Sequence, residues 1–249
     1  MEKLLVFNLK GNFAHFNNPL TFSKYLKHTY YIPPKSTILG LLGSLIGLDG
    51  YGNKKIPEFI DKLSNINLYI KVIDYKKLNK MIVQYNSLNS FANNVVINPN
   101  VIMKEEILCN PKYEIGLLLD DSNELHNKII HNIKNNVSKY HLYLGKNEFF
   151  VNIEYIDLFD FKYIDKITSE FIDKHGGVII DSIFPIPNDL SIVGQQVDNF
   201  AYRLDNDLRY QHKKVIFNHK QSIRLYLQNN LQKDDDKLII TNNKIYYLF

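Results

Sequence analysis

The stretch from Phe7 to Tyr51 combines the residue types that bind phosphate groups and unstacked bases. Lysines and histidines alternate with aromatics through a loop, and hydroxyl residues then open an apolar helix. Backbone N–H groups at a helix start carry partial positive charge and suit phosphate, while aromatics beside cations suit single-stranded bases. A surface loop followed by a buried helix explains the same residues equally well. The anion-cradle hypothesis rests on Lys10, His15, Lys35, Ser36 and Thr37.

Residues 211–224, QHKKVIFNHKQSIR, form a second basic segment that contains no acidic residue. A phosphate track that includes Lys213 and Lys214 is favoured over a solvated basic strand, given the basic loop near the N-terminus. The formal net charge of +4 and the pI of about 8.8 permit nucleic-acid binding without requiring it.

Metal and nucleophile chemistry has little support in the residue spacing. His126 and His131 lie five positions apart on an expected helix, which misses the spacing of a shared zinc face. Cys109 is the single cysteine, and neither a P-loop nor a G-x-S-x-G motif occurs. We therefore expect no metal and no cofactor.

Two acidic pairs, Glu105-Glu106 and Asp120-Asp121, would point to opposite faces of a strand and are expected to be solvated. A metal-free ribonuclease would instead draw on histidine, lysine or tyrosine. Each of these types more often packs or forms hydrogen bonds within a fold. The candidates for such an activity are His15, His28, Tyr30 and Tyr51.

The elements that must position these residues follow from hydrophobic periodicity. Their order predicts an α+β fold with a ferredoxin-like βαββαβ sandwich. Three glycines within the first helix, Gly40, Gly43 and Gly47, are expected to allow close packing against the sheet. Strands are expected at residues 4–9, 66–75, 80–85, 101–108, 113–119, 140–144 and 151–158, and helices at 35–47, 56–63 and 125–137, the last capped by Ser122 or Asn123.

An insertion at residues 79–112 separates the second and third strands of this unit. Long connections in compact domains are usually functional or disordered, and strand-like flanks argue here against disorder. A protruding hairpin could wedge apolar side chains near its tip between bases, or those side chains could pack back onto the body. The residues concerned are Val95, Val96 and Ile97.

The division into domains is expected near residue 160, with a ferredoxin-like domain over 1–160 and a β-rich region over 161–249. Phe184 to Asn188 is expected to be irregular because it contains two prolines, and a hairpin is expected to turn at Asn242-Asn243. A lone cysteine suits a reducing compartment, and the apolar run at 38–48 is too short to span a bilayer. A soluble cytoplasmic protein with no membrane partner is expected.

Four segments together resemble a known family. FNLKGNFAHFNNP, TYYIPPKSTILGLLGSLIGLDGYG, EEILCNPKYEIGLLL and HLYLGKNEFFVNIEY occur in the order and spacing of the fifth family of CRISPR-associated proteins. The sequence is most similar to the subtype I-B branch, a Cascade subunit of the RAMP superfamily, over about residues 3–160. The resemblance implies a ferredoxin-like (RRM-type) domain with a β-hairpin thumb at about 86–112, followed by a small β-rich region.

The resemblance also implies a function. Such a subunit holds the 5′ handle of the CRISPR RNA (crRNA) and caps the backbone of the type I Cascade effector complex in antiviral defence. Its partners would be the crRNA, target DNA near the PAM, the backbone subunit and the large subunit. The thumb tip, Val95 to Ile97, would flip out a nucleotide. The counterpart of the family's glycine-rich loop would be residues 145–148, which places Lys146 and Asn147 at the RNA.

Two alternatives remain beside this non-catalytic role. In one branch of the family, subtype I-C, the protein itself cleaves the precursor RNA without metal, using tyrosine, histidine and lysine. The motif around the adjacent Lys-His pair of that branch has no clear counterpart here, so an RNA-binding subunit is preferred to a metal-independent endoribonuclease. The other alternative is a scaffold that binds partner proteins and never contacts RNA.

Overall fold

The computed structural model describes residues 1–19, 26–52, 55–87, 101–164, 181–185, 196–205, 207–217, 237–242 and 244–249. The centre is a four-stranded antiparallel sheet with the order β4-β7-β1-β8. In the βαββαβ unit this places the first strand between the third and the fourth. The predicted ferredoxin-like α+β fold is therefore confirmed. The strands are β1 Glu2–Lys10, β4 Leu68–Val72, β7 Lys112–Asp120 and β8 Asn152–Phe159.

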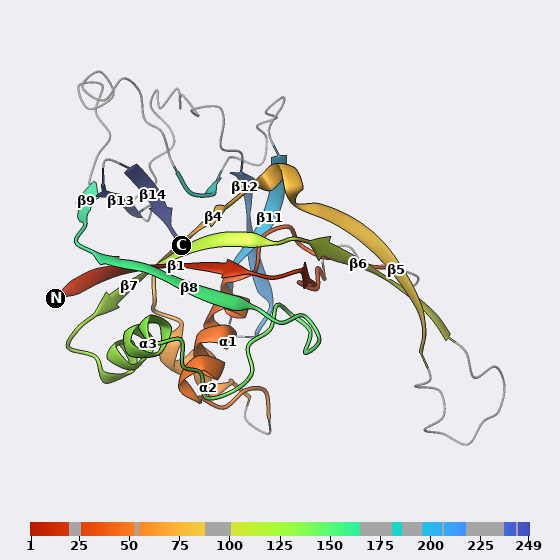
Figure 1. Cartoon of the computed structure of the whole chain (residues 1–249), viewed down its shortest axis with the longest axis horizontal. Coiled ribbons are helices and arrows are strands. Elements are labelled where there is room, and N and C mark those ends of the chain that lie inside the picture. The colour runs from red at the N-terminus through yellow and green to blue at the C-terminus, as the bar shows by residue number, and fades with distance from the viewer. Residues whose placement is uncertain are drawn as a thin grey trace.

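Three helices, α1 Lys35–Ile46, α2 Glu58–Leu63 and α3 Glu124–Lys134, lie on one side of this sheet (Figure 1). Alternate residues of β1, such as Leu5 and Phe7, join the core that includes the helices, because successive strand residues point to opposite faces. The predicted cap of α3 is confirmed. The Asn123 side chain accepts hydrogen bonds from the backbone N–H groups of Leu125 and His126.

The C-terminal hairpin, β13 Lys237–Thr241 and β14 Lys244–Leu248, covers the opposite face of the sheet. Leu4 and Val6 pack there, and the rings of Tyr69 and Tyr246 stack with centroids 4.1 Å apart. The predicted turn is confirmed at Asn242, whose φ of 48° suits asparagine. A short strand, β9 Lys162–Ile164, pairs with β13.

A further three-stranded sheet contains β10 Phe184–Pro185, β11 Gln196–Leu204 and β12 Tyr210–Phe217 in the order β10-β12-β11. The prediction that Phe184 and Pro185 are irregular was wrong. Both residues pair with β12, and β10 is an edge strand, where proline is tolerated. The predicted division near residue 160 stays a prediction.

The hairpin of β5 Asn79–Ser87 and β6 Val101–Cys109 projects from the body as a thumb (Figure 1). It occupies the insertion predicted at residues 79–112, and the predicted thumb boundary at residue 86 falls within β5. Two short strands, β2 Phe13–Ala14 and β3 Leu26–Lys27, pair with β6 toward the body. A single 3-10 turn, η1 Tyr75–Lys77, precedes β5.

The expected strand at 140–144 was wrong. It forms only an isolated bridge between Tyr143 and Phe150. Its start is held by a helix, since the N–H groups of Lys139 and Tyr140 donate to carbonyls of α1 at Leu45 and Ser44. The segment therefore caps a helix instead of extending a sheet.

The glycines of α1 serve a different purpose from the predicted close packing against the sheet. A Cβ at Gly43 would lie 2.6 Å from Cβ of Phe59, so Gly43 allows α2, and not the sheet, to approach α1. Gly47 ends α1 in the left-handed conformation, with φ 86°. No helix in the part of the chain that the structure describes is both long and apolar enough to cross a membrane.

Candidate nucleic-acid interface

The thumb presents apolar and aromatic side chains to solvent along its described length. Ile82 and Ile102 are more than half exposed, and Met81 and Tyr85 are substantially exposed. Exposed apolar groups on a projecting hairpin are typical of a surface that a partner covers. The predicted tip residues, Val95, Val96 and Ile97, lie outside the described residues.

The base of the thumb contains a buried carboxylate. Glu105 is 1% exposed, and its oxygens pair with Lys27 Nζ at 3.2 Å and with Lys146 Nζ. Burial alone would raise its pKa, but hydrogen bonds from Lys146, Tyr85 and Lys27 outweigh that effect and lower the pKa to about 2. Glu105 therefore joins β6 to β3 and to the predicted glycine-rich-loop counterpart.

The neighbouring carboxylate of Glu106 points to a second set of partners. It accepts from the Thr29 N–H at 3.1 Å and from Lys80 Nζ at 3.1 Å, and it lies 3.0 Å from His28 Nδ1. Burial opposes ionisation, but these donors lower the pKa of Glu106. The prediction that Glu105 and Glu106 are solvated was therefore wrong, whereas their opposite directions follow the strand alternation. We call Glu105, Glu106, Lys27, His28, Lys80 and Lys146 the thumb-base cluster.

His15 and the loop at 145–148 meet beside this cluster. The His15 backbone N–H donates to the Leu144 carbonyl at 3.1 Å, and its Nδ1 lies 2.8 Å from the Glu106 carbonyl oxygen. His15 is 5% exposed, and burial lowers its pKa. Gly145 has φ 86°, and a Cβ there would lie 1.8 Å from the His15 carbonyl oxygen. Only glycine fits this contact.

A groove of about 690 Å³ connects the first turn of α1 with the segment before Gly145. Ser36 and Thr37 line it from the helix, and the exposed aromatics Tyr51, Tyr140 and Tyr143 line it from the loops. The structure thus brings two predicted regions, the hydroxyls of the helix start and Gly145, to one surface. The tyrosines can stack on bases, and the helix start supplies partial positive charge.

The other predicted site residues lie apart from this groove. Lys10 pairs with Glu154 on β8, and the Lys35 ammonium donates to the Phe249 oxygen at 3.0 Å. Asn147 is exposed in the turn beside Lys146. The predicted cradle is therefore divided, with Lys10, His15 and Lys35 in three different contact sets.

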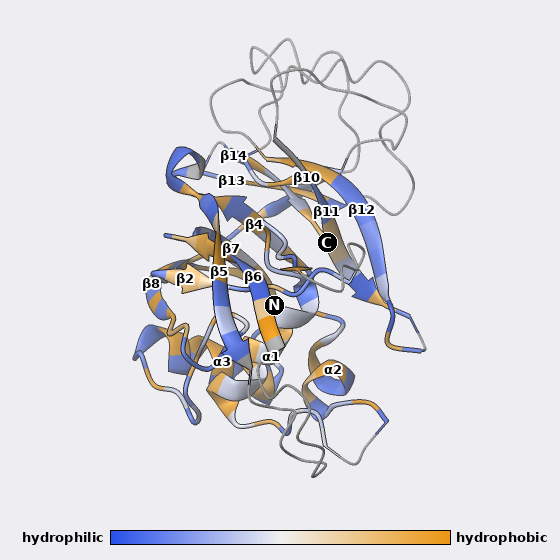
Figure 2. Cartoon of the chain, turned by 90° about the vertical axis from the view of Figure 1, so that its right-hand side faces the viewer, coloured by the Kyte–Doolittle hydropathy of each residue, from blue (hydrophilic) through white to orange (hydrophobic). Residues whose placement is uncertain are grey.

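The basic segment is described only as far as Phe217. Figure 2 shows a hydrophilic part of β12, the strand that contains Lys213 and Lys214. Lys213 Nζ lies 4.9 Å from the ring centroid of Tyr202 and 3.3 Å from the Tyr247 hydroxyl. At least one cation of the predicted phosphate track therefore packs on aromatic rings.

The sequence contains two adjacent Lys-His pairs, which the prediction of no clear counterpart to the family's Lys-His motif did not consider. Lys27-His28 belongs to the thumb-base cluster, where each side chain faces a different carboxylate. Lys174-His175 lies outside the described residues. Of the predicted ribonuclease candidates, Tyr30 is fully buried, and its hydroxyl lies 2.6 Å from His212 Nε2. Among the described residues no group of three His, Cys, Asp or Glu side chains could hold a metal ion.

The family model described as CRISPR-associated protein (Cas_Cas5) matches residues 4–217. This chain belongs to that family. The family named from the four sequence segments is thereby confirmed, whereas the subtype I-B branch stays a prediction. A search of curated proteins found no match.

Among solved structures, the chain is similar to a CRISPR protein from Archaeoglobus fulgidus, with 17% identity, a TM-score of 0.50, and 100% of this chain and 99% of that chain covered. A chain of a CRISPR RNA-guided surveillance complex has 11% identity and a TM-score of 0.48, with 86% and 88% covered. A chain of a Type III-B Cmr-beta complex bound to cognate target RNA and AMPPnP has 10% identity and a TM-score of 0.44, with 86% and 84% covered. At such identities, the A. fulgidus likeness supports the fold alone.

Proposed function

We propose that this Cas5-family chain is a non-catalytic RNA-binding subunit of a type I CRISPR effector complex. It holds the 5′ handle of the crRNA and caps the backbone of the complex. The observation that carries the proposal is the thumb. Its exposed apolar and aromatic side chains project from the body, while the buried carboxylate of Glu105 at its base pairs with Lys146 of the loop at 145–148.

The groove beside this loop is the proposed seat of splayed handle bases. Tyr140 and Tyr143 are 51% and 40% exposed, so each has a ring face to offer. Stacking on such rings contributes about 1–3 kcal/mol per base without reading the sequence. Ser36 and Thr37 would contact phosphate or ribose oxygens from the helix start.

The remaining assignments belong to the same proposal. Lys146 and Asn147 would contact RNA from the loop, and Val95, Val96 and Ile97 would do so from the thumb tip. The backbone subunit, the large subunit and target DNA near the PAM are the proposed partners. The exposed thumb apolars Ile82 and Ile102 suit contact with a neighbouring subunit or with bases.

Binding of labelled repeat-derived RNA at two salt concentrations tests the proposal, with the products separated on a denaturing gel. We expect salt-sensitive binding with the RNA left intact. The combined change Tyr140→Ala and Tyr143→Ala should weaken binding about tenfold or more. Tyr163→Ala removes an equally exposed tyrosine from β9 and is the matched control. Equal binding by both variants would contradict the groove assignment.

A metal-independent endoribonuclease is the second candidate, and the thumb-base cluster is the observation that favours it. A carboxylate beside an imidazole, with lysines nearby, is a set that can move protons and offset phosphate charge. Cleavage of repeat RNA in EDTA to a 2′,3′-cyclic phosphate product, abolished by His28→Ala, would establish it. Partner-subunit binding that is unchanged by removing RNA would instead favour a scaffold.

A further inference from the structure

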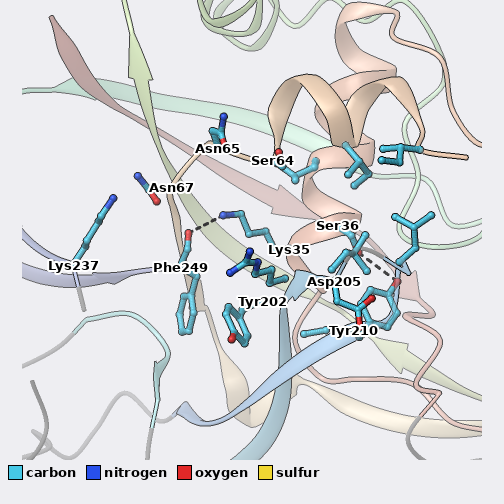
Figure 3. Close-up of a pocket in the computed structure, with 17 residues that line it drawn as sticks. Lys35, Ser36, Ser64, Asn65, Asn67, Tyr202, Asp205, Tyr210, Lys237 and Phe249 are labelled. Atoms are coloured by element: carbon cyan, nitrogen blue, oxygen red, sulfur yellow. Dashed lines mark hydrogen bonds between the residues drawn. The ribbon is translucent and has the colours of Figure 1, made fainter. Parts of the chain in front are cut away.

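A second cavity, of about 570 Å³, lies between α1, the segment after α2 and the C-terminal strands (Figure 3). Three cations from distant parts of the sequence line it: Lys35 from α1, Arg203 from β11 and Lys237 from β13. The cavity has the size of a site for a small organic ligand.

The cations at the rim, Arg203 and Lys237, form no ion pair within the described residues. The Lys35 ammonium donates to the Phe249 oxygen at 3.0 Å. Asp205 also lines the cavity, but its carboxylate accepts from the backbone N–H groups of Asp207 and Arg209. Burial, followed by the charges of Lys237 and Arg203, lowers the pKa of Lys35 to about 8. An anion in the cavity would relieve this repulsion.

The rest of the lining suits a nucleoside. Tyr202, Tyr210 and Phe249 supply aromatic surface. Figure 3 shows Asn65 and Asn67 across the cavity from Tyr202 and Tyr210. The two asparagine side chains have no hydrogen-bond partner in the described part of the chain, so their amides are available to a ligand. Such a mixture of rings and free amides is typical of sites that hold a base or a ribose.

The helix start adds to the positive field. Ser36 lines the cavity, and α1, which has 12 residues, carries neither a side-chain cap nor an acid in its first turn. The N–H groups of an uncapped first turn favour an anion. Three cations and a helix start therefore act on the same cavity.

We propose that this cavity binds a nucleoside 5′-phosphate. The phosphate lies among Lys35, Arg203 and Lys237, and the nucleoside lies against Tyr202 and Tyr210. The site goes beyond the proposed handle-binding function, which belongs to the thumb and the groove. The phosphate monoester could be that of a free nucleotide or that of a 5′-phosphorylated RNA end.

The first arm of the test titrates each of the four nucleoside 5′-monophosphates separately into the full chain by calorimetry. We expect binding of at least one, weakened tenfold or more by Arg203→Gln with Lys237→Gln. Both side chains are exposed at the rim, so this variant should fold. Arg209→Gln with Lys162→Gln removes the same charge from exposed positions outside the cavity and should bind like the parent.

Nucleoside without phosphate should bind at least tenfold more weakly than its monophosphate. Inorganic phosphate that binds as tightly as the nucleotide would overturn the nucleoside half of the proposal.

The second arm compares one RNA with a 5′-phosphate and with a 5′-hydroxyl. A 5′-phosphate preference that disappears in the Arg203 and Lys237 variant, without binding of free nucleotide, assigns the site to an RNA end. If neither nucleotide nor 5′-phosphorylated RNA distinguishes the variant from its control, the proposal is wrong. Binding of the 5′-hydroxyl RNA reports on handle binding separately, so failure of one proposal is distinguishable from failure of the other.

Discussion

Two regions of this molecule gather cations, and they differ in whether those cations pair with carboxylates. At the thumb base, Lys27, Lys80 and Lys146 each face Glu105 or Glu106. In the cavity beside α1, Lys35, Arg203 and Lys237 line one space, and Arg203 and Lys237 form no ion pair within the described residues. Compensated charge serves the fold, since it joins strand to loop. Uncompensated charge costs stability and leaves room for an anion.

The titration of the two regions expresses the same contrast. Partners lower the pKa of Glu105 to about 2 despite burial, so its ionised form is favoured by folding. Burial and like charges lower the pKa of Lys35 to about 8, so its ionised form is disfavoured by folding. The two groups should therefore change stability in opposite senses when they are neutralised.

Neutralising Glu105 should have the largest effect. Glu105→Gln leaves Lys27 and Lys146 facing a buried neutral amide, and we expect the free energy of unfolding to fall by about 3–5 kcal/mol. Urea denaturation at pH 7 measures it. Because the folded pKa is lowered, the difference from the parent should shrink as pH falls from 4.5 toward 2. Glu154→Gln, which breaks the exposed pair with Lys10, should leave the midpoint unchanged. Equal losses for both variants would contradict the buried role.

Lys35 should show the opposite sign with pH. Between its folded pKa of about 8 and the ordinary value of 10.5, the unfolded chain binds more protons, so stability rises with pH through this window. Relative to Lys35→Met, the parent should gain about 3 kcal/mol between pH 7 and 10.5. Chemical denaturation of the two proteins across that range measures it. A stability difference between the two proteins that does not change with pH would mean that a negative charge compensates the Lys35 ammonium.

Gly145→Ala tests the backbone contact that joins the loop to His15. A left-handed residue with a Cβ costs about 1–2 kcal/mol before any steric clash, and here the Cβ would meet the His15 carbonyl oxygen. We expect a loss of about 2 kcal/mol or more in unfolding free energy, with weaker RNA binding. Gly52→Ala is the control, because a Cβ at Gly52 meets nothing within 4 Å and Gly52 is not part of the groove lining.

Neutralising the exposed cavity cations should have the smallest effect on stability. Arg203→Gln with Lys237→Gln should change the free energy of unfolding by less than about 0.5 kcal/mol, since no ion pair is lost. Lys80→Gln at the thumb base should cost about 1–3 kcal/mol, because Glu106 loses its charged donor. Thermal or urea unfolding of both variants checks the contrast. Comparable losses would remove the distinction between the two regions.

Much of the fold was predictable because its signals are local. Asn123 caps α3 as predicted, and Asn242 turns the terminal hairpin, since capping and turn chemistry depend on neighbouring residues alone. The predicted hydroxyls Ser36 and Thr37 and the loop at Gly145 also meet at one groove. A prediction failed where tertiary hydrogen bonds competed with the local sequence signal. The sequence at 140–144 is typical of a strand, but the N–H groups of Lys139 and Tyr140 bond to the end of α1.

From the sequence alone follow the βαββαβ order, the inserted hairpin and the family, because hydrophobic period and motif spacing are properties of the chain itself. The tertiary structure alone decides which charges are compensated. Glu105 and Glu106 are adjacent in the sequence, yet their ion-pair partners are residues 27, 28, 80 and 146. Lys35 meets Arg203 and Lys237 across more than 160 residues. Electrostatic energy depends on distance and burial in space, and sequence separation carries neither.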